Sequence, residues 1–360
     1  NGGGIVAMDL TISTIENCDI SNNFAASNGG GIQFISFAEP SFINCTISNN
    51  NAASKGGGIQ MANYCTPTIT NCIINDNSAA NGAGISLSNH ANPIIESTFI
   101  ERNIAASQAA GIMLEDNSTG DFNNLTISDN IASNGSGGGI FALDFSNSTF
   151  FDCILSNNSA TASGAGIQTS SNSCPSFNSC TIENNIITNY GGAVVTIGTS
   201  YPSFIDCTIR NNGADTGGGF WIGKETEPYI ESTTIFNNFA NHRGGGIYIQ
   251  TGANQTIISS TIQNNTALQG GGIFTESRSR GSISSSSIIE NYGKTDGGGA
   301  YISCSDTKFN NPIFSENYAV NGGAICIETC FIPDERGEIV NAIIKDNVGV
   351  YGGGIYVTTD

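Results

Sequence analysis

Apolar and small residues recur along the chain with a fixed period. A Gly-rich triplet followed by one apolar residue, as in Gly29-Gly30-Gly31-Ile32 and Gly56-Gly57-Gly58-Ile59, returns about every 27 residues. We name this apolar residue the anchor. The anchors fall at positions 5, 32, 59, 85, 112, 140, 167, 194, 220, 247, 273, 300, 325 and 355. A constant period of this size indicates a repeat architecture in which each unit packs on its neighbours.

Within one repeat the apolar residues alternate with a period of two. In the unit 29–55, short alternating runs occur around Ile32, Phe42 and Ile47, and a polar connection follows at 48–53. Alternation of this kind is typical of β-strands and not of helices. We therefore predict an all-β, right-handed, single-stranded parallel β-helix of about 13 coils with three short strands each. It forms one domain over residues 1–360, as a segment of a longer repeat array.

Asparagine marks a second fixed position, three residues after the apolar residue of the third strand. Asn tolerates left-handed backbone conformations, and stacked side-chain amides can hydrogen-bond from one coil to the next. The sequence therefore predicts a structural ladder along the coils. Its members are Asn23, Asn50, Asn77, Asn103, Asn130, Asn158, Asn185, Asn212, Asn238, Asn265, Asn291, Asn317 and Asn347.

The pairing of these two motifs resembles the GGAI and FxxN repeats of the polymorphic outer-membrane protein family of autotransporter adhesins. The literal match is Phe314-Ser315-Glu316-Asn317 followed by Gly322-Gly323-Ala324-Ile325, and related forms occur along the whole chain. The resemblance implies a β-helix with an extracellular passenger, adhesin or structural role. The membrane barrel of that family has no counterpart in this sequence.

Charge excludes some classes of partner. The chain has 11 Lys and Arg against 30 Asp and Glu, so its formal net charge is −19. Without a basic stripe to neutralise phosphates, we expect no nucleic acid partner. No apolar run is long enough for a membrane-spanning helix in this segment. The resemblance to the autotransporter adhesins implies an extracellular or cell-surface location.

An aromatic column is the strongest candidate for a binding site. The residues directly after four consecutive anchors are Trp221, Tyr248, Phe274 and Tyr301. Alternation places them on the outer face of the first strand, where an exposed aromatic column could stack sugars or dock a neighbouring filament. The alternative is that the rings only stiffen the outer face of the sheet.

Cysteines and sequons give further candidates. Of the 11 cysteines, most recur at one inward position and are interpreted as small apolar fillers rather than a metal or redox ladder, whereas Cys304 and Cys330 could form a disulfide. N-x-S/T sequons occur no more often than composition predicts. The best possible glycosylation sites lie in turns, at Asn117, Asn134, Asn147 and Asn254, whereas Asn44 and Asn124 should be protected.

No catalytic, metal or cofactor site is expected. Pectin-lyase-like enzymes share this fold, but they need clustered carboxylates or Ca²⁺ with a basic residue in a deep cleft. Here the turns are short, and His90 and His242 are isolated in the sequence. We expect an extracellular structural protein that assembles end to end into a filament or surface fibre. A cell-surface adhesin or carbohydrate-binding module is the first alternative, and a polysaccharide-active enzyme is the second.

Overall fold

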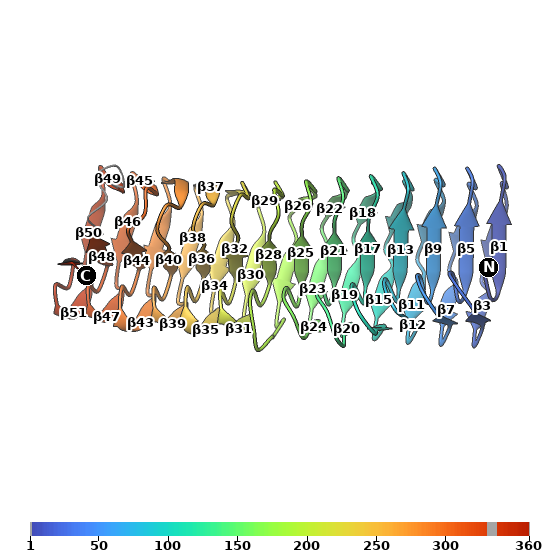
Figure 1. Cartoon of the computed structure of the whole chain (residues 1–360), viewed down its shortest axis with the longest axis horizontal. Helices are drawn as coiled ribbons and strands as arrows, with labels where there is room; N and C mark the ends of the chain where they lie inside the picture. The colour runs from blue at the N-terminus through green and yellow to red at the C-terminus, as the bar shows by residue number, and fades with distance from the viewer. Residues whose placement is uncertain (1, 330–336, 360) are drawn as a thin grey trace. The chain divides into compact units, whose positions relative to one another are not determined.

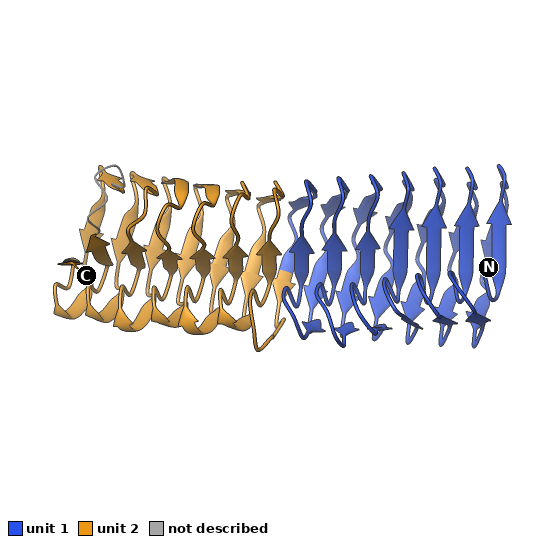
Figure 2. Cartoon of the chain, viewed as in Figure 1, with its two compact units in different colours: residues 1–181 blue, residues 182–360 orange. Residues whose placement is uncertain are grey.

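The computed structural model describes residues 2–329 and 337–359, and these contain strands and turns but no helix. They form two compact units, residues 1–181 and 182–360 (Figure 2). In each unit, the corresponding strands of successive coils pair side by side in parallel (Figure 1). The predicted parallel β-solenoid is therefore confirmed.

The first sheet is built from the strands that begin at or near the anchors. In unit 1 these strands are β1 (Ile5–Met8), β5 (Ile32–Ile35), β9 (Ile59–Ala62), β13 (Ile85–Ser88), β17 (Ile112–Leu114), β21 (Ile140–Ala142) and β25 (Ile167–Thr169). In unit 2 they are β28 (Val194–Thr196), β32 (Phe220–Ile222), β36 (Ile247–Ile249), β40 (Ile273–Thr275), β44 (Ala300–Ser303), β48 (Ile325–Thr329) and β52 (Ile355–Thr359).

The second sheet carries the large inward aromatic residues. In unit 1 its strands are β2 (Thr14–Glu16), β6 (Ser41–Ile43), β10 (Thr68–Thr70), β14 (Ile94–Glu96), β18 (Asp121–Asn123), β22 (Thr149–Phe151) and β26 (Ser176–Asn178). In unit 2 they are β29 (Ser203–Ile205), β33 (Tyr229–Glu231), β37 (Asn254–Ile258), β41 (Arg280–Ser284), β45 (Lys308–Asn310) and β49 (Glu338–Val340).

The third sheet precedes the Asn positions. In unit 1 its strands are β3 (Asp19–Ser21), β7 (Thr46–Ser48), β11 (Ile73–Asn75), β15 (Phe99–Glu101), β19 (Thr126–Ser128) and β23 (Ile154–Ser156), and β27 (Thr181–Glu183) contains the boundary between the units. In unit 2 they are β30 (Thr208–Arg210), β34 (Thr234–Phe236), β38 (Thr261–Gln263), β42 (Ser287–Ile289), β46 (Ile313–Ser315) and β50 (Ile343–Lys345).

A fourth strand follows the Asn position, where the sequence predicted only a polar connection. It has two residues in the coils of unit 1 and four or five in those of unit 2. In unit 1 these strands are β4 (Phe24–Ala25), β8 (Asn51–Ala52), β12 (Ser78–Ala79), β16 (Ile104–Ala105), β20 (Ile131–Ala132) and β24 (Ser159–Ala160). In unit 2 they are β31 (Gly213–Thr216), β35 (Phe239–Arg243), β39 (Thr266–Gln269), β43 (Tyr292–Asp296), β47 (Tyr318–Asn321) and β51 (Val348–Tyr351). A two-residue segment shows no alternation, so its strand character was missed.

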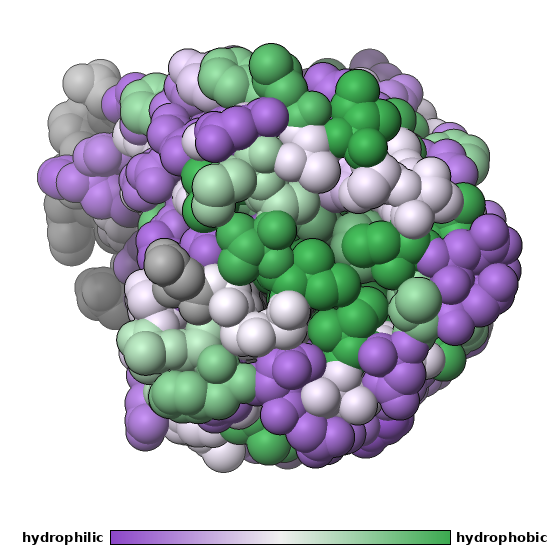
Figure 3. Space-filling view, turned by 90° about the vertical axis from the view of Figure 1, so that its right-hand side faces the viewer, coloured by the Kyte–Doolittle hydropathy of each residue, from purple (hydrophilic) through white to green (hydrophobic). Residues whose placement is uncertain are grey.

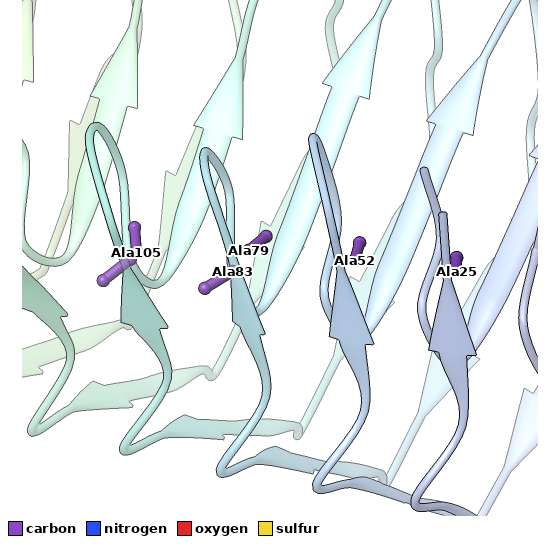
Figure 4. Close-up of a cluster of buried hydrophobic side chains, with 6 residues drawn as sticks. Ala25, Ala52, Ala79, Ala83 and Ala105 are labelled. Carbon is purple, nitrogen blue, oxygen red and sulfur yellow. The ribbon is translucent and has the colours of Figure 1, made fainter. Parts of the chain in front are cut away.

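Small side chains let this fourth strand approach the glycine turn. Ala25, Ala52, Ala79 and Ala105 stack on consecutive coils as a buried column (Figure 4). A Cβ added to Gly30 would lie 2.7 Å from the carbonyl oxygen of Asn51, so the glycine leaves room for the neighbouring strand.

The interior of each coil is apolar. Ile32, Phe34, Phe42 and Ile47, all predicted to point inward, have no solvent exposure. Corresponding residues pair across coils without a shift in register, as between Ile32 and Ile59. Figure 3 shows the N-terminal face of unit 1, with hydrophobic side chains at the centre and hydrophilic ones largely around them. This register stacks similar apolar side chains inside the coil. A shift of the register by one residue would turn them to the outer face.

The Asn ladder connects the coils through hydrogen bonds. The Oδ1 of Asn77 accepts from the backbone N of Asn50 at 2.9 Å and from its Nδ2 at 3.1 Å. The Nδ2 of Asn50 also donates to the carbonyl of Ile20 at 2.8 Å. The same contacts recur from Asn23 to Asn158 in unit 1 and from Asn185 to Asn347 in unit 2. Burial of these amides is thus compensated by hydrogen bonding.

Candidate functional site

The four aromatic residues of the predicted column form one continuous stack in unit 2. Trp221, Tyr248, Phe274 and Tyr301 are in register on β32, β36, β40 and β44. Successive ring centroids lie 6.0, 5.7 and 4.9 Å apart, with nearly parallel planes. The spacing follows the distance between hydrogen-bonded strands, which brings like residues into contact.

The predicted exposure of this column is wrong. Tyr248, Phe274 and Tyr301 are 6, 2 and 8% exposed, and Trp221 is partly buried. The rings form the floor of a groove. One rim is formed by the residues directly before the glycine triplet. The other is formed by residues at or just after the end of the first strand.

This aromatic groove encloses a hollow of about 360 Å³. One rim contributes Arg243 and Gln269. The other rim contributes Thr251, Glu276, Ser277, Ser303 and Glu328. Phe274 and Tyr301 line the floor between them, so aromatic surface and charged groups meet in one hollow.

Glu276 is the central polar group of the groove. Its Oε2 accepts from the hydroxyl of Thr251 at 3.1 Å, and its Oε1 accepts from the Tyr248 hydroxyl. Arg243 pairs with the same carboxylate at 3.4 Å while its guanidinium lies 4.9 Å from the ring centroid of Phe274. Arg243 therefore forms an ion pair and a cation–π contact across the floor.

Burial raises the pKa values of three residues in the floor of the groove. Desolvation raises the pKa of the Tyr248 hydroxyl, and the nearby Glu276 carboxylate raises it further. The pKa of Tyr301 is raised by burial and by Glu328, whose Oε2 accepts from its hydroxyl at 3.1 Å. Burial also raises the pKa of the next floor residue, Cys326, to about 12. The Tyr248 and Tyr301 hydroxyls are therefore protonated at neutral pH and donate to Glu276 and Glu328.

These groups suit binding of a polyhydroxylated ligand. The aromatic floor offers apolar surface, and the carboxylates of Glu276 and Glu328 offer acceptors for ligand hydroxyls. Within residues 2–329 and 337–359, no three His, Cys, Asp or Glu side chains gather as metal ligands.

The four predicted sequons are all solvent-exposed. Asn134 donates to the carbonyl of Ala106 at 3.1 Å, and Asn254 donates to Glu227 at 3.1 Å. Asn117 and Asn147 lie in exposed turns. Their glycosylation stays a prediction. The expected protection of Asn44 and Asn124 is wrong, because both residues are exposed to solvent.

Cysteine predictions are tested only in part. Cys304 is disulfide-bonded, but its predicted partner Cys330 lies outside the described residues. Cys45 and Cys72 are buried in the core, as expected for apolar fillers. Cys326 is 1% exposed and packs with the rings of the aromatic groove.

One aromatic stack was missed in the sequence. Phe37, Tyr64 and His90 stack in the turn after the first strand of unit 1, with ring centroids 5.3 and 4.7 Å apart. Their positions recur with the same period as the anchors, so the repeat alignment contained the signal.

The parallel coils, the amide ladder and the short turns define the class: a β-solenoid repeat protein. The sequence matches the family model described as right handed beta helix region over residues 1–178 and 194–360, so the chain belongs to this family. A comparison with curated proteins found no match. None of the described residues forms a helix suited to crossing a bilayer.

The fold is similar to that of a solved autotransporter passenger domain. A chain of the cryo-EM structure of the Vag8–C1 inhibitor complex superimposes with a TM-score of 0.54 and 10% sequence identity, over 99% of this chain and 98% of that one. At this identity the similarity concerns the fold.

Proposed function

We propose that this chain is an extracellular or cell-surface β-solenoid with an adhesin-like role, which binds carbohydrate through the aromatic groove. The fold shared with an autotransporter passenger domain supports the location. The GGAI and FxxN repeats, as in Phe314–Asn317 and Gly322–Ile325, support kinship with autotransporter adhesins.

The observation that carries the proposal is the floor of the aromatic groove. Phe274 and Tyr301 stack in parallel, and Arg243 and Glu276 pair above them within one hollow. The stacked, buried rings also stabilise the outer face of the sheet, by about 0.5–1.5 kcal/mol for each aromatic pair. The same groups can hold the apolar face and the hydroxyls of a sugar.

We propose binding without catalysis. The carboxylate of Glu276 already accepts hydrogen bonds from Tyr248 and Thr251, and Glu328 accepts one from Tyr301. Carboxylates held in this way are positioned as acceptors for ligand hydroxyls. Hydrolysis of any bound glycan would contradict this part of the proposal.

A glycan array followed by calorimetry with the best glycan tests the groove. We expect Phe274→Ala and Arg243→Ala to weaken binding about tenfold or more, because each removes a contact worth about 1.4 kcal/mol or more. Tyr292→Ala is the matched control, since Tyr292 stacks on Tyr318 in the fourth sheet, outside the groove. Equal affinity of all three variants, or no glycan bound, would refute carbohydrate binding here.

End-to-end assembly into a filament is a second proposal. It is supported by the parallel, in-register pairing of successive strands in the first sheet, such as Ile32 with Ile59, because the same pairing can join two copies. Electron microscopy of the purified chain at increasing concentration tests it. Particles that stay single at all concentrations would rule it out.

A further inference from the structure

Six asparagines of the chain are directly followed by glycine, and all but Asn1 lie among the described residues. Such a pair is chemically labile, because glycine has no Cβ and its backbone can bring its nitrogen close to the preceding side chain. That nitrogen can then attack Cγ of the asparagine. The five described pairs begin at Asn28, Asn81, Asn134, Asn212 and Asn321.

The attack converts the amide to an acid in two steps. The glycine nitrogen first bonds to Cγ and loses its proton, while the Cγ–Nδ2 bond breaks and ammonia leaves, so that a succinimide ring forms. Water then opens the ring to aspartate, or to isoaspartate when the ring opens at its other carbonyl. The net change is one amide and one water converted to one carboxylate and one ammonium ion.

Four of the five glycines hold their nitrogen in hydrogen bonds between coils. Ring formation removes the hydrogen of this N–H group and leaves the carbonyl of the neighbouring coil without its donor, so it is costly wherever such a bond exists. The bonds run from Gly29 to Lys55 (2.9 Å), from Gly82 to Gln108 (3.0 Å), from Gly213 to Asn185 (3.1 Å) and from Gly322 to Tyr351 (2.9 Å).

The asparagine side chains of the same four pairs are held as well. The Oδ1 atoms of Asn28 and Asn81 accept from backbone N–H groups of the next coil at 3.2 and 3.1 Å. Asn212 is a buried member of the Asn ladder, and the Nδ2 of Asn321 donates to Asp296 at 2.7 Å. Attack on Cγ requires each of these side chains to leave its partners.

The pair Asn134–Gly135 lies in the longest turn of its kind. This turn spans 10 residues from Asn130 to the anchor Ile140, whereas the other turns between a ladder Asn and the next anchor span 8 or 9. The N–H of Gly135 has no acceptor among the described residues, although Gly135 is buried. Ring formation therefore breaks no bond between coils here, and it removes a buried donor that has no partner.

The side chain of Asn134 is also less restrained than those of the other pairs. Asn134 is exposed to solvent, whereas the other four asparagines are partly or fully buried. Its Nδ2 donates to the carbonyl of Ala106 at 3.1 Å, and its Oδ1 accepts no hydrogen bond from the residues that the structure describes. Water can therefore reach the side chain for the second step.

We propose that Asn134 is a site of spontaneous deamidation, which the folded chain selects over the other four described Asn-Gly pairs. Each event replaces a neutral amide with a negative charge. Asn134 is also the acceptor of the sequon Asn134-Gly135-Ser136, and deamidation removes that acceptor, so the two modifications compete. The site does not depend on the function proposed above.

Peptide mass spectrometry of the full chain, made in a host that does not glycosylate Asn, tests the site. After incubation of the folded chain at mildly alkaline pH, we expect Asn134 to have deamidated about tenfold or more faster than any of the other four, because each of those must give up a hydrogen bond. Isoaspartate is measured with protein isoaspartyl methyltransferase. Asn134→Gln should abolish the acidic species in isoelectric focusing, since glutamine would need a less favourable six-membered ring.

The same incubation in guanidinium chloride separates the effect of the fold from that of the local sequence. All five pairs should then react at similar rates, because they share the two reacting residues and the bonds between coils are lost. Three results would overturn the proposal: Asn134 stays intact in the folded chain, Asn134 reacts no faster than Asn28 or Asn81, or its lead persists unchanged in the unfolded chain.

Discussion

Replacement of one buried amide should reveal how much the Asn ladder stabilises the solenoid. Asn103 lies within unit 1 and has no solvent exposure. Its Oδ1 accepts from the backbone N of Asn77 at 3.0 Å and from its Nδ2 at 3.1 Å. Its Nδ2 donates to the carbonyl of Ile74 and to the Oδ1 of Asn130, both at 3.0 Å. Asn103→Ala removes all four hydrogen bonds and leaves their partners buried.

The cost follows from the groups that lose a partner. The backbone N–H of Asn77 and one Nδ2 hydrogen of Asn77 are left without an acceptor, and the carbonyl of Ile74 loses a donor. The Oδ1 of Asn130 still accepts from the backbone N of Asn103 at 3.0 Å. At about 1–3 kcal/mol for each buried group without a partner, and allowing for partial relaxation, the free energy of unfolding should fall by about 3–6 kcal/mol.

Urea unfolding followed by circular dichroism measures this loss. Asn92→Ala is the matched control, because Asn92 is exposed and its side chain makes no hydrogen bond among the described residues. We expect the control to lie within about 0.5 kcal/mol of the parent chain. If Asn103→Ala also lies within about 1 kcal/mol of the parent, the ladder does not stabilise the fold as argued.

Three further perturbations test other parts of the structure. Burial raises the pKa of Glu115, so its carboxyl stays protonated to a higher pH in the folded chain than in the unfolded chain. The stability that this proton contributes is therefore present at low pH and is lost as the pH rises through the pKa of the folded state. We therefore compare the unfolding free energies of the parent chain and Glu115→Gln by urea titration. The parent value minus the variant value should decrease from about pH 4 to pH 7, and a flat or rising difference would contradict this reasoning. Gly56→Val should cost about 2 kcal/mol or more, because φ is +66° and a Cβ would lie 2.5 Å from the anchor carbonyl, whereas Gly213→Ala, with 3.8 Å of clearance, should be nearly neutral. Iodoacetamide should label exposed Cys18 in the folded chain but not Cys72, whose pKa burial raises to about 11, and mass spectrometry showing equal labelling would disprove the protection.

The repeat made the stacking of the coils predictable from the sequence. Residues at one repeat position, such as Asn50 and Asn77, must be neighbours once the coil closes, and both alternation and turn chemistry agree on the register. Core positions such as Ile32 and Phe42 follow from the same rule. The two-residue strand at Asn51–Ala52 did not follow, because its pairing depends on a backbone already fixed by the ladder.

The candidate sites were less predictable. Alternation placed Tyr248 and Phe274 on the outer face, but it carries no information on the reach of side chains from the turns. Arg243 and Glu276 are 33 residues apart and meet only because both project over the same floor.

The outward-facing residues of the first sheet vary from coil to coil, whereas the Asn ladder does not. These outward-facing residues change from Gln33 and Gln60 through Phe141 to Tyr248, while the amide ladder behind the coils stays the same. Because floor side chains do not enter the apolar interior, one coil can exchange its chemistry without disturbing the winding of the next. The outward-facing residues of the first sheet can therefore change at one coil without changing the fold of the others.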